Sequence, residues 1–213
     1  MKKYLVIEGN IGAGKTTLSN RLAEHWQVPV LLEKFMENPF LPKFYAQPER
    51  YGFSVETAFL AERYRQMHDE FASAELRQQA VVADYSFYKS LIFAGKTLQG
   101  DEYQLFKEIF GIINSKLPQP HLFVYLKAST TKLLRQIAQR GRDFEQQITA
   151  DYLEQIDQAY LHFMEQASGL RCVLIETENL DYLNNEEHFN YLVELLDRHY
   201  PYGMTRIEPA LGC

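Results

Sequence analysis

The chain has 213 residues, 46% of them hydrophobic, and a formal net charge of −6, which suits one domain spanning residues 1–213 with its own core. The acidic balance disfavours a nucleic-acid polymer as partner, and two cysteines are too few for a disulfide framework or a zinc site. No apolar run approaches the roughly 18 residues of a membrane span, so we expect a cytoplasmic protein without membrane partners.

The first predicted strand, Tyr4–Ile7, leads into the sequence GNIGAGKT and then into a predicted helix from Lys15 to about Trp26. This loop matches G-x-x-x-x-G-K-[ST], in which backbone N–H groups surround phosphate, the lysine reaches the β and γ oxygens, and the final hydroxyl can hold magnesium. The expected phosphate-binding residues are Gly9, Asn10, Ile11, Gly12, Ala13, Gly14, Lys15, Thr16 and Thr17. The loop predicts a nucleoside triphosphate ligand with Mg²⁺ at its phosphates.

Further apolar runs alternate with helix-patterned stretches along the chain. The predicted strands are Val28–Leu32, Ala80–Ala83, His121–Leu126 and Arg171–Ile175, and the predicted helices are residues 54–78, 100–117, 129–140, 151–167 and 185–199, with another that Ser86 could cap. Prolines should keep residues 33–42 irregular, and the tail at about 201–213 should be extended or loose. This order predicts an α/β fold with a five-stranded parallel sheet covered by helices on both faces.

Two carboxylates are expected at strand ends, where open α/β sheets place their chemistry. Glu33 follows the second predicted strand and Asp84 the third. On the 54–78 helix, Glu56 and Arg63 share one face two turns apart. Burying both charges is costly unless something polar shares them, so we favour a substrate-reading role over a plain ion pair.

These residues together resemble the deoxynucleoside kinase family over about Tyr4 to Tyr182. The ordered signals are residues 8–16, Glu33, Tyr45 with Pro48-Glu49-Arg50-Tyr51, Arg63, Asp84-Tyr85-Ser86 and Arg140-Gly141-Arg142-Asp143-Phe144-Glu145. The resemblance implies a P-loop kinase fold, a lid at about 135–150 that carries arginines, and ATP-dependent phosphorylation of a deoxynucleoside 5′-hydroxyl in nucleotide salvage.

The resemblance also implies a role for each site residue. Glu33 would take the 5′-hydroxyl proton, while Tyr45 and Glu145 would hold the 3′-hydroxyl. Asp84 and Thr16 would orient magnesium. The catalytic set would be Glu33, Lys15, Arg140 and Arg142, the last two clamping phosphoryl oxygens from the lid. Residues 176–181 resemble the loop that cradles adenine.

Three departures from the family pattern stand out. Tyr85 occupies the usual position of an arginine, and Lys89 is either its replacement or a solvent-facing lysine. The spacing after Asp84 is about one residue short, which leaves Ser90 unassigned. Gln136 stands where many relatives carry another lid arginine, and the sequence does not decide whether Gln136 or Arg135 faces the phosphates.

Base choice depends on Glu56, because an ionised carboxylate only accepts hydrogen bonds. Both orientations of a purine can supply donors to it, so deoxyguanosine and deoxyadenosine stay equally open while pyrimidines are disfavoured. Two other functions remain: a nucleoside monophosphate kinase resembling thymidylate kinase, and a nucleotide-dependent switch protein, although the switch's Asn-Lys-x-Asp signature is absent. The resemblance further implies a homodimer, or a heterodimer with a related kinase subunit, formed through helices 54–78 and 100–117.

Overall fold

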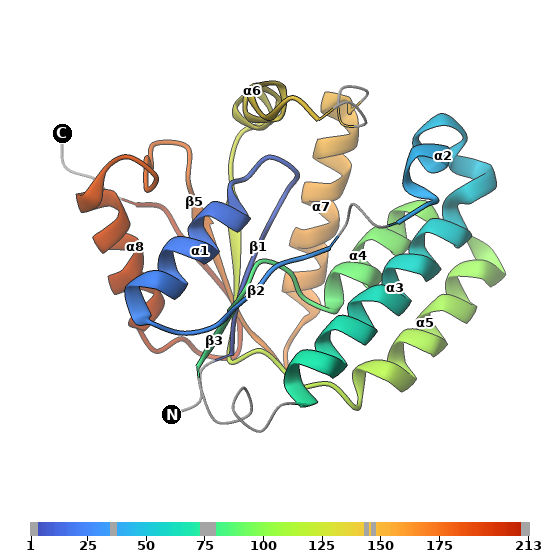
Figure 1. Ribbon diagram of the computed structural model, residues 1–213, viewed down its shortest axis with the longest axis horizontal. Helices are drawn as coiled ribbons and strands as arrows, with labels where there is room; N and C mark the ends of the chain where they lie inside the picture. The colour runs from blue at the N-terminus through green and yellow to red at the C-terminus, as the bar shows by residue number, and fades with distance from the viewer. Residues whose placement is uncertain (1–3, 35–37, 73–79, 143–144, 146–147, 210–213) are drawn as a thin grey trace.

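A parallel sheet of six strands runs through the part of the chain that the computed structural model describes, residues 4–34, 38–72, 80–142, 145 and 148–209 (Figure 1). Its strands are β1 (Tyr4–Gly9), β2 (Val30–Leu31), β3 (Val81–Ala83), β4 (Leu122–Lys127), β5 (Arg171–Glu176) and β6 (Gly203–Ile207). The strand order is β2-β3-β1-β4-β5-β6, with every neighbouring pair parallel. The carboxyl ends of the strands therefore meet along one edge, as the sequence predicts for the site.

Helices cover both faces of this sheet. They are α1 (Lys15–Trp26), α2 (Leu41–Ala46), α3 (Pro48–Ala72), α4 (Tyr88–Thr97), α5 (Gly100–Asn114), α6 (Thr130–Arg140), α7 (Ala150–Gln166) and α8 (Glu186–Asp197). In Figure 1, α1 and α8 lie on one side of the sheet, α3, α4, α5 and α7 on the other, and α6 above its upper edge. Within the described ranges, no helix combines the length and apolarity needed to cross a membrane.

Strand β1 shows why the predicted strands read as continuous apolar runs. Tyr4 and Val6 pack into the core beneath α3, α4, α5 and α7, whereas Leu5 and Ile7 pack into the core beneath α1, α6 and α8. Successive side chains in a strand point to opposite faces, so a strand buried on both faces carries hydrophobic residues at consecutive positions, here residues 4 to 7.

The prediction of five strands is wrong by one, because part of the tail expected to be extended or loose forms β6. Gly203 to Ile207 pair in parallel with β5 at the sheet edge. Burial along β6 alternates between intermediate and exposed residues, so the segment lacks the apolar run that marks the other strands. The backbone hydrogen bonds of the β5 edge, rather than hydrophobic pattern, order this strand.

Two local predictions near the site also need correction. Residues 33–42 were expected to be irregular, but α2 starts at Leu41 and places Pro42 in its first turn, where the missing N–H costs nothing. Ser86 does not cap α4; its N–H and hydroxyl both donate to the buried Glu8 carboxylate, at 2.8 and 3.0 Å. Residues 73–78 of the predicted long helix lie outside the described residues.

Candidate active site

The phosphate loop lies between β1 and α1 and is braced from two sides. Gly12 and Gly14 have φ of 85° and 81°, a left-handed conformation that favours glycine. A Cβ on Gly14 would come within 2.9 Å of the Tyr182 hydroxyl, which donates to the Ala13 carbonyl at 2.8 Å. Asn10 uses its side-chain amide to donate to the Leu153 carbonyl at 2.7 Å. The side chain of Asn10 is thus structural, and only its backbone is left for phosphate.

Lys15, Thr16 and Asp84 meet at the carboxyl ends of β1 and β3. The Lys15 ammonium donates to the carbonyls of Gly9 and Asn10, and burial lowers its pKa to about 8. The Thr16 hydroxyl donates to Asp84 Oδ2 at 2.5 Å, while Asp84 Oδ1 accepts the Glu33 N–H at 2.7 Å. Magnesium prefers oxygen ligands and keeps several waters beside one or two carboxylates and substrate phosphates. The adjacent oxygens of Thr16 and Asp84 fit such an ion.

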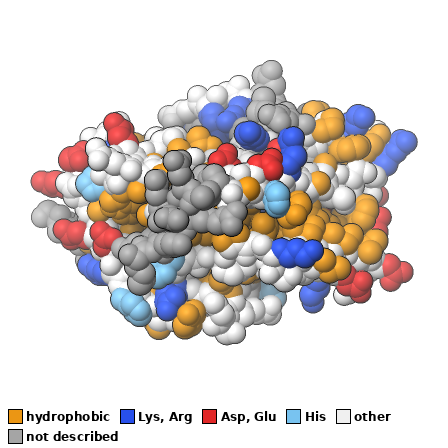
Figure 2. All heavy atoms as spheres, turned by 60° about the horizontal axis from the view of Figure 1, so that its bottom comes forward, with side chains coloured by type: hydrophobic (Ala, Val, Ile, Leu, Met, Phe, Trp, Pro, Cys, Tyr) orange, Lys and Arg blue, Asp and Glu red, His pale blue; other side chains and the backbone are white. Residues whose placement is uncertain are grey.

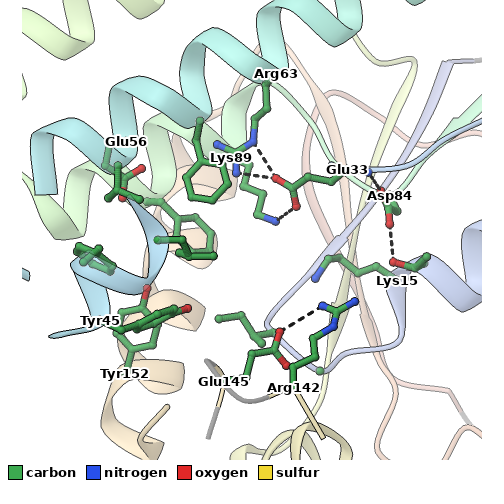
Figure 3. A pocket seen from close by; sticks show the side chains of 18 of the residues that line it. Lys15, Glu33, Tyr45, Glu56, Arg63, Asp84, Lys89, Arg142, Glu145 and Tyr152 are labelled. Atoms are coloured by element: carbon green, nitrogen blue, oxygen red, sulfur yellow. Dashed lines mark hydrogen bonds and ion pairs between the residues drawn. The ribbon is translucent and has the colours of Figure 1, made fainter. Parts of the chain in front are cut away.

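Glu33 lies between two cations (Figure 3). Arg63 on α3 donates to its Oε1 from Nε at 2.9 Å and from Nη2 at 2.6 Å, and the Lys89 ammonium on α4 contacts Oε2. Burial alone would raise the pKa of Glu33, but the charges of Lys89 and Arg63 outweigh it and hold the pKa at about 2. The carboxylate is therefore ionised throughout the physiological range of pH.

Glu56 and Arg63 do not form the plain ion pair that was the alternative to a substrate-reading role. The guanidinium of Arg63 donates to Glu33 and, through Nη1, to the Ser90 hydroxyl at 2.9 Å. Glu56 instead contacts the Thr97 hydroxyl at 2.8 Å and is 4% exposed. Both residues still line the same cavity. Both side chains of the proposed substrate-reading pair therefore reach the cavity, but they do not contact each other through an ion pair.

Lys89 is not a solvent-facing lysine. Its side chain is 12% exposed, lines the cavity and contacts Glu33. Tyr85, at the position of the usual family arginine, is buried in the core and is not among the residues that line the cavity. The structure thus brings a cation to Glu33 from the first turn of α4, although the sequence left that choice open.

The arginines expected in the lid both reach Glu145. Arg140, at the end of α6, donates to the carboxylate from Nε and Nη2, and Arg142 donates from Nη1 at 3.3 Å. Between them Gly141 ends the helix with a φ of 67°. Residues 143–144 and 146–147 of the predicted lid lie outside the described residues.

Tyr45 on α2 and Tyr152 on α7 lie close together in Figure 3, on the side of the cavity opposite Lys15 and Asp84. Burial, with a smaller contribution from the Glu145 charge, raises the pKa of Tyr45 to about 12, so its hydroxyl stays a hydrogen-bond donor at neutral pH. The aromatic rings thus narrow the end of the cavity that is remote from the phosphate loop.

A second cavity lies beside the phosphate loop. Its lining includes most of residues 176–181, the loop expected to cradle adenine. Residues 177–184 line it together with Ala13, Lys132, Arg135, Gln136 and Gln139. The Lys132 ammonium donates to the carbonyls of Thr177 and Glu178, which fastens α6 to this loop. Arg135 and Gln136 both line this second cavity and neither lines the first.

One cavity collects most of the predicted site residues. It is lined by Ile11, Gly12, Lys15, Thr16, Glu33, Tyr45, Glu56, Arg63, Asp84, Arg140, Arg142 and Glu145. Gly9, Asn10, Ala13, Gly14 and Thr17 belong to the loop but do not line it. Sequence reasoning missed Tyr152 and Phe93, which line the cavity as aromatic residues of helices and carry no signal that separates them from core residues.

Comparison with known proteins agrees with this geometry. The family model described as deoxynucleoside kinase matches residues 5–200. The chain is 36% identical over 190 residues to a deoxyguanosine kinase of Bacillus subtilis (strain 168), covering 87% of this chain and 92% of that protein. It is 26% identical over 194 residues to a deoxyadenosine/deoxycytidine kinase of the same strain, covering 89% of each.

A solved structure shares the fold. The deoxyadenosine kinase from M. mycoides with bound dATP superposes with a TM-score of 0.76 at 19% identity, covering 92% of this chain and all of that one. The family match spans the phosphate loop, both strand-end carboxylates and the lid. The chain therefore belongs to the deoxynucleoside kinase family, whose members transfer a phosphoryl group to a deoxynucleoside.

Proposed function

We propose that this kinase phosphorylates the 5′-hydroxyl of a purine deoxynucleoside, deoxyguanosine or deoxyadenosine, in nucleotide salvage. Its family membership favours deoxynucleoside phosphorylation over the monophosphate kinase and the switch protein. The observation that carries the purine assignment is Glu56, a buried carboxyl group at the end of the cavity that is remote from the phosphate loop.

Glu33 is the proposed base for the 5′-hydroxyl proton. A group with a pKa of about 2 is a weak base, so it removes the proton only as the phosphoryl group arrives and the hydroxyl becomes acidic. A weak base is sufficient for phosphoryl transfer through a loose transition state, because positioning and charge neutralisation supply most of the catalysis. Lys89, in contact with Glu33, is placed to neutralise oxygens near that hydroxyl.

The donor is a nucleoside triphosphate, which we propose is ATP, with its adenine in the cavity beside residues 177–184. Lys15 would leave the loop carbonyls for the β and γ oxygens. Magnesium held by Thr16 and Asp84 would neutralise charge on the phosphates. Arg140 and Arg142 would close over the transferring group as planar cations suited to two oxygens at once.

The sugar is proposed to bind between the lid and α2. Tyr45 would donate to the 3′-hydroxyl and Glu145 would accept from it. Because Glu145 now accepts from both lid arginines, movement of these arginines to the phosphates would free its oxygens for the sugar. Lid closure and sugar binding would then support each other.

We also propose that the chain forms a homodimer in the cytoplasm. Leu105 and Ile112 on α5 are 50% and 65% exposed and lie seven residues apart, on one stripe of the helix. Figure 2 shows hydrophobic side chains gathered on the side of the molecule where α3–α5 lie in Figure 1. A second copy of the chain would bury this stripe by symmetry.

Measuring ADP production separates the candidate functions. With ATP and Mg²⁺, the proposal expects rapid turnover with deoxyguanosine or deoxyadenosine and slower turnover with deoxycytidine and thymidine. Preference for deoxynucleoside monophosphates would establish the monophosphate kinase, and hydrolysis that needs no acceptor would establish the switch protein. A native enzyme that prefers deoxycytidine or thymidine would overturn the purine assignment.

A further inference from the structure

Glu56 is a buried carboxyl group on α3. It is 4% exposed, and the described residues form no ion pair with it. Arg63, from the same helix, and Lys89, from α4, both place their charges against Glu33 instead. Because burying an unpaired carboxylate is costly, the neutral form of Glu56 becomes accessible at ordinary pH.

Thr97 on α4 is arranged to serve either form of Glu56. Its single hydroxyl proton lies between two acceptors, Glu56 Oε1 at 2.8 Å and the Phe93 carbonyl at 3.1 Å. Against an ionised Glu56, Thr97 can donate to only one of them. Against a protonated Glu56 in the empty site, the acid donates to Thr97 Oγ1 and Thr97 donates to Phe93. When a base accepts the acid proton from Oε2 instead, Thr97 donates to Oε1, so Thr97 matches either arrangement.

The other polar groups around Glu56 leave its pKa near neutral pH. Burial raises its pKa to about 7, against the Thr97 hydrogen bond and the more distant charges of Arg63 and Lys89. Tyr45 on α2 and Tyr152 on α7 face it as neutral hydroxyls, since burial raises the pKa of each. Small changes in pH therefore change the fraction of Glu56 that is ionised.

We propose that Glu56 reads two purines in two protonation forms. Ionised, it accepts the neighbouring N1–H and N2–H₂ donors of guanine. Protonated, it offers one donor and one acceptor, as a glutamine does, and suits the amino group and adjacent ring nitrogen of adenine. This inference rests on the proposed function, in which Glu56 faces the base, and it makes deoxyguanosine and deoxyadenosine alternative substrates of one site.

The test is the ratio of kcat/KM for deoxyguanosine to kcat/KM for deoxyadenosine between about pH 6 and about pH 8.5. Ionisations of Glu33, the lid and the donor affect both substrates and cancel in this ratio. We expect the ratio to rise about tenfold or more with pH, with a midpoint near neutrality. Glu56→Gln should give a flat ratio that favours deoxyadenosine, whereas Glu49→Gln, an exposed residue of α3, should keep the native slope.

A calorimetric measurement needs no turnover and covers a Glu56 variant that fails to fold. In buffers of different ionisation enthalpy near neutral pH, the native enzyme should take up protons on binding deoxyadenosine and release them on binding deoxyguanosine. Thr97→Val should shift the midpoint of the ratio to higher pH, because the carboxylate loses its donor.

A flat native ratio, or equal proton exchange with both purines, would overturn the inference and leave purine phosphorylation standing. Kinase activity confined to pyrimidine deoxynucleosides would instead overturn the proposed function on which the inference rests. The two failures are therefore distinguishable in the same set of assays.

Discussion

The roles proposed for Glu33 and Lys89 rest on a single cluster of three charges. Glu33→Gln keeps size and hydrogen bonding but cannot take the 5′-hydroxyl proton. We expect kcat to fall by about 10² or more with little change in ATP binding, measured by steady-state kinetics and donor titration. Glu24→Gln, an exposed glutamate on α1, is the matched control and should leave both unchanged. Near-normal turnover in Glu33→Gln would remove this residue from the mechanism.

The pH profile adds a second measurement on Glu33. Its pKa of about 2 lies below the usual carboxyl value, so the native enzyme should show no loss of kcat/KM from Glu33 protonation between about pH 5 and about pH 8. Lys89→Met removes one of the two cations that lower this pKa, and the acidic limb should then move to higher pH.

Lys89→Met should also lower kcat by about tenfold or more, because the developing charge loses a cation. Lys89→Arg should recover part of the rate. Lys96→Met, at an exposed position of the same helix, should behave as the native enzyme. Unchanged kinetics in Lys89→Met would show that no cation replaces the arginine missing at position 85.

The sequence could not show which side chains that are distant along the chain contact one another in the site. Glu33, Asp84 and the phosphate loop were predictable because strand ends of a parallel sheet converge. From the sequence, Arg63 could pair with Glu56 on its own helix or with Glu33 at a strand end. It pairs with Glu33 because α3 packs over the edge of the sheet. Lys89 was similarly undecidable until the first turn of α4 was placed.

At the level of elements, α6 joins the two cavities. Its start is fastened to the loop at residues 177–178 through Lys132, and its end carries Arg140 into the first cavity.

Clamping by the lid arginines should occur mainly in the transition state. Arg140→Lys or Arg142→Lys should therefore lower kcat by about tenfold and raise KM by less. Arg135, on the same helix, lines the other cavity, so Arg135→Lys is expected to change the KM for the phosphate donor rather than kcat. A pure KM effect of Arg140→Lys would reduce the lid to a docking loop.

The elements that sequence reasoning missed share a cause. The predicted strands buried on both faces carry apolar runs, and α1 was predicted with its observed bounds because its start follows a motif. Strand β6 and helix α2 lack those signals, since β6 is half exposed and α2 has a proline as its second residue. Tertiary contacts order both segments, and hydrophobic period alone does not report them.

At the scale of the whole molecule, the proposed homodimer depends on the exposed apolar stripe of α5. Ile112→Glu places a charge at a position that is 65% exposed in the single chain and would be buried in the proposed homodimer. Sedimentation velocity should show a dimer for the native protein and a shift toward monomer for Ile112→Glu. Glu194→Lys, a charge change on an exposed position of α8, should not shift it. A native protein that sediments as a monomer at micromolar concentration would exclude this interface.

The two oxygens of Asp84 give the enzyme a thermodynamic property that neither half of the site has alone. Oδ2 accepts from Thr16 on the donor side, and Oδ1 accepts from the backbone of Glu33 on the acceptor side. A ligand that reorients this carboxylate from one side changes its hydrogen bond on the other, so the two binding equilibria are coupled. Because the binding of any two ligands forms a closed thermodynamic cycle, the factor by which the nucleotide alters nucleoside affinity must equal the factor by which the nucleoside alters nucleotide affinity. Titrations in either order of addition should return that one number, and Asp84→Asn should bring it toward unity.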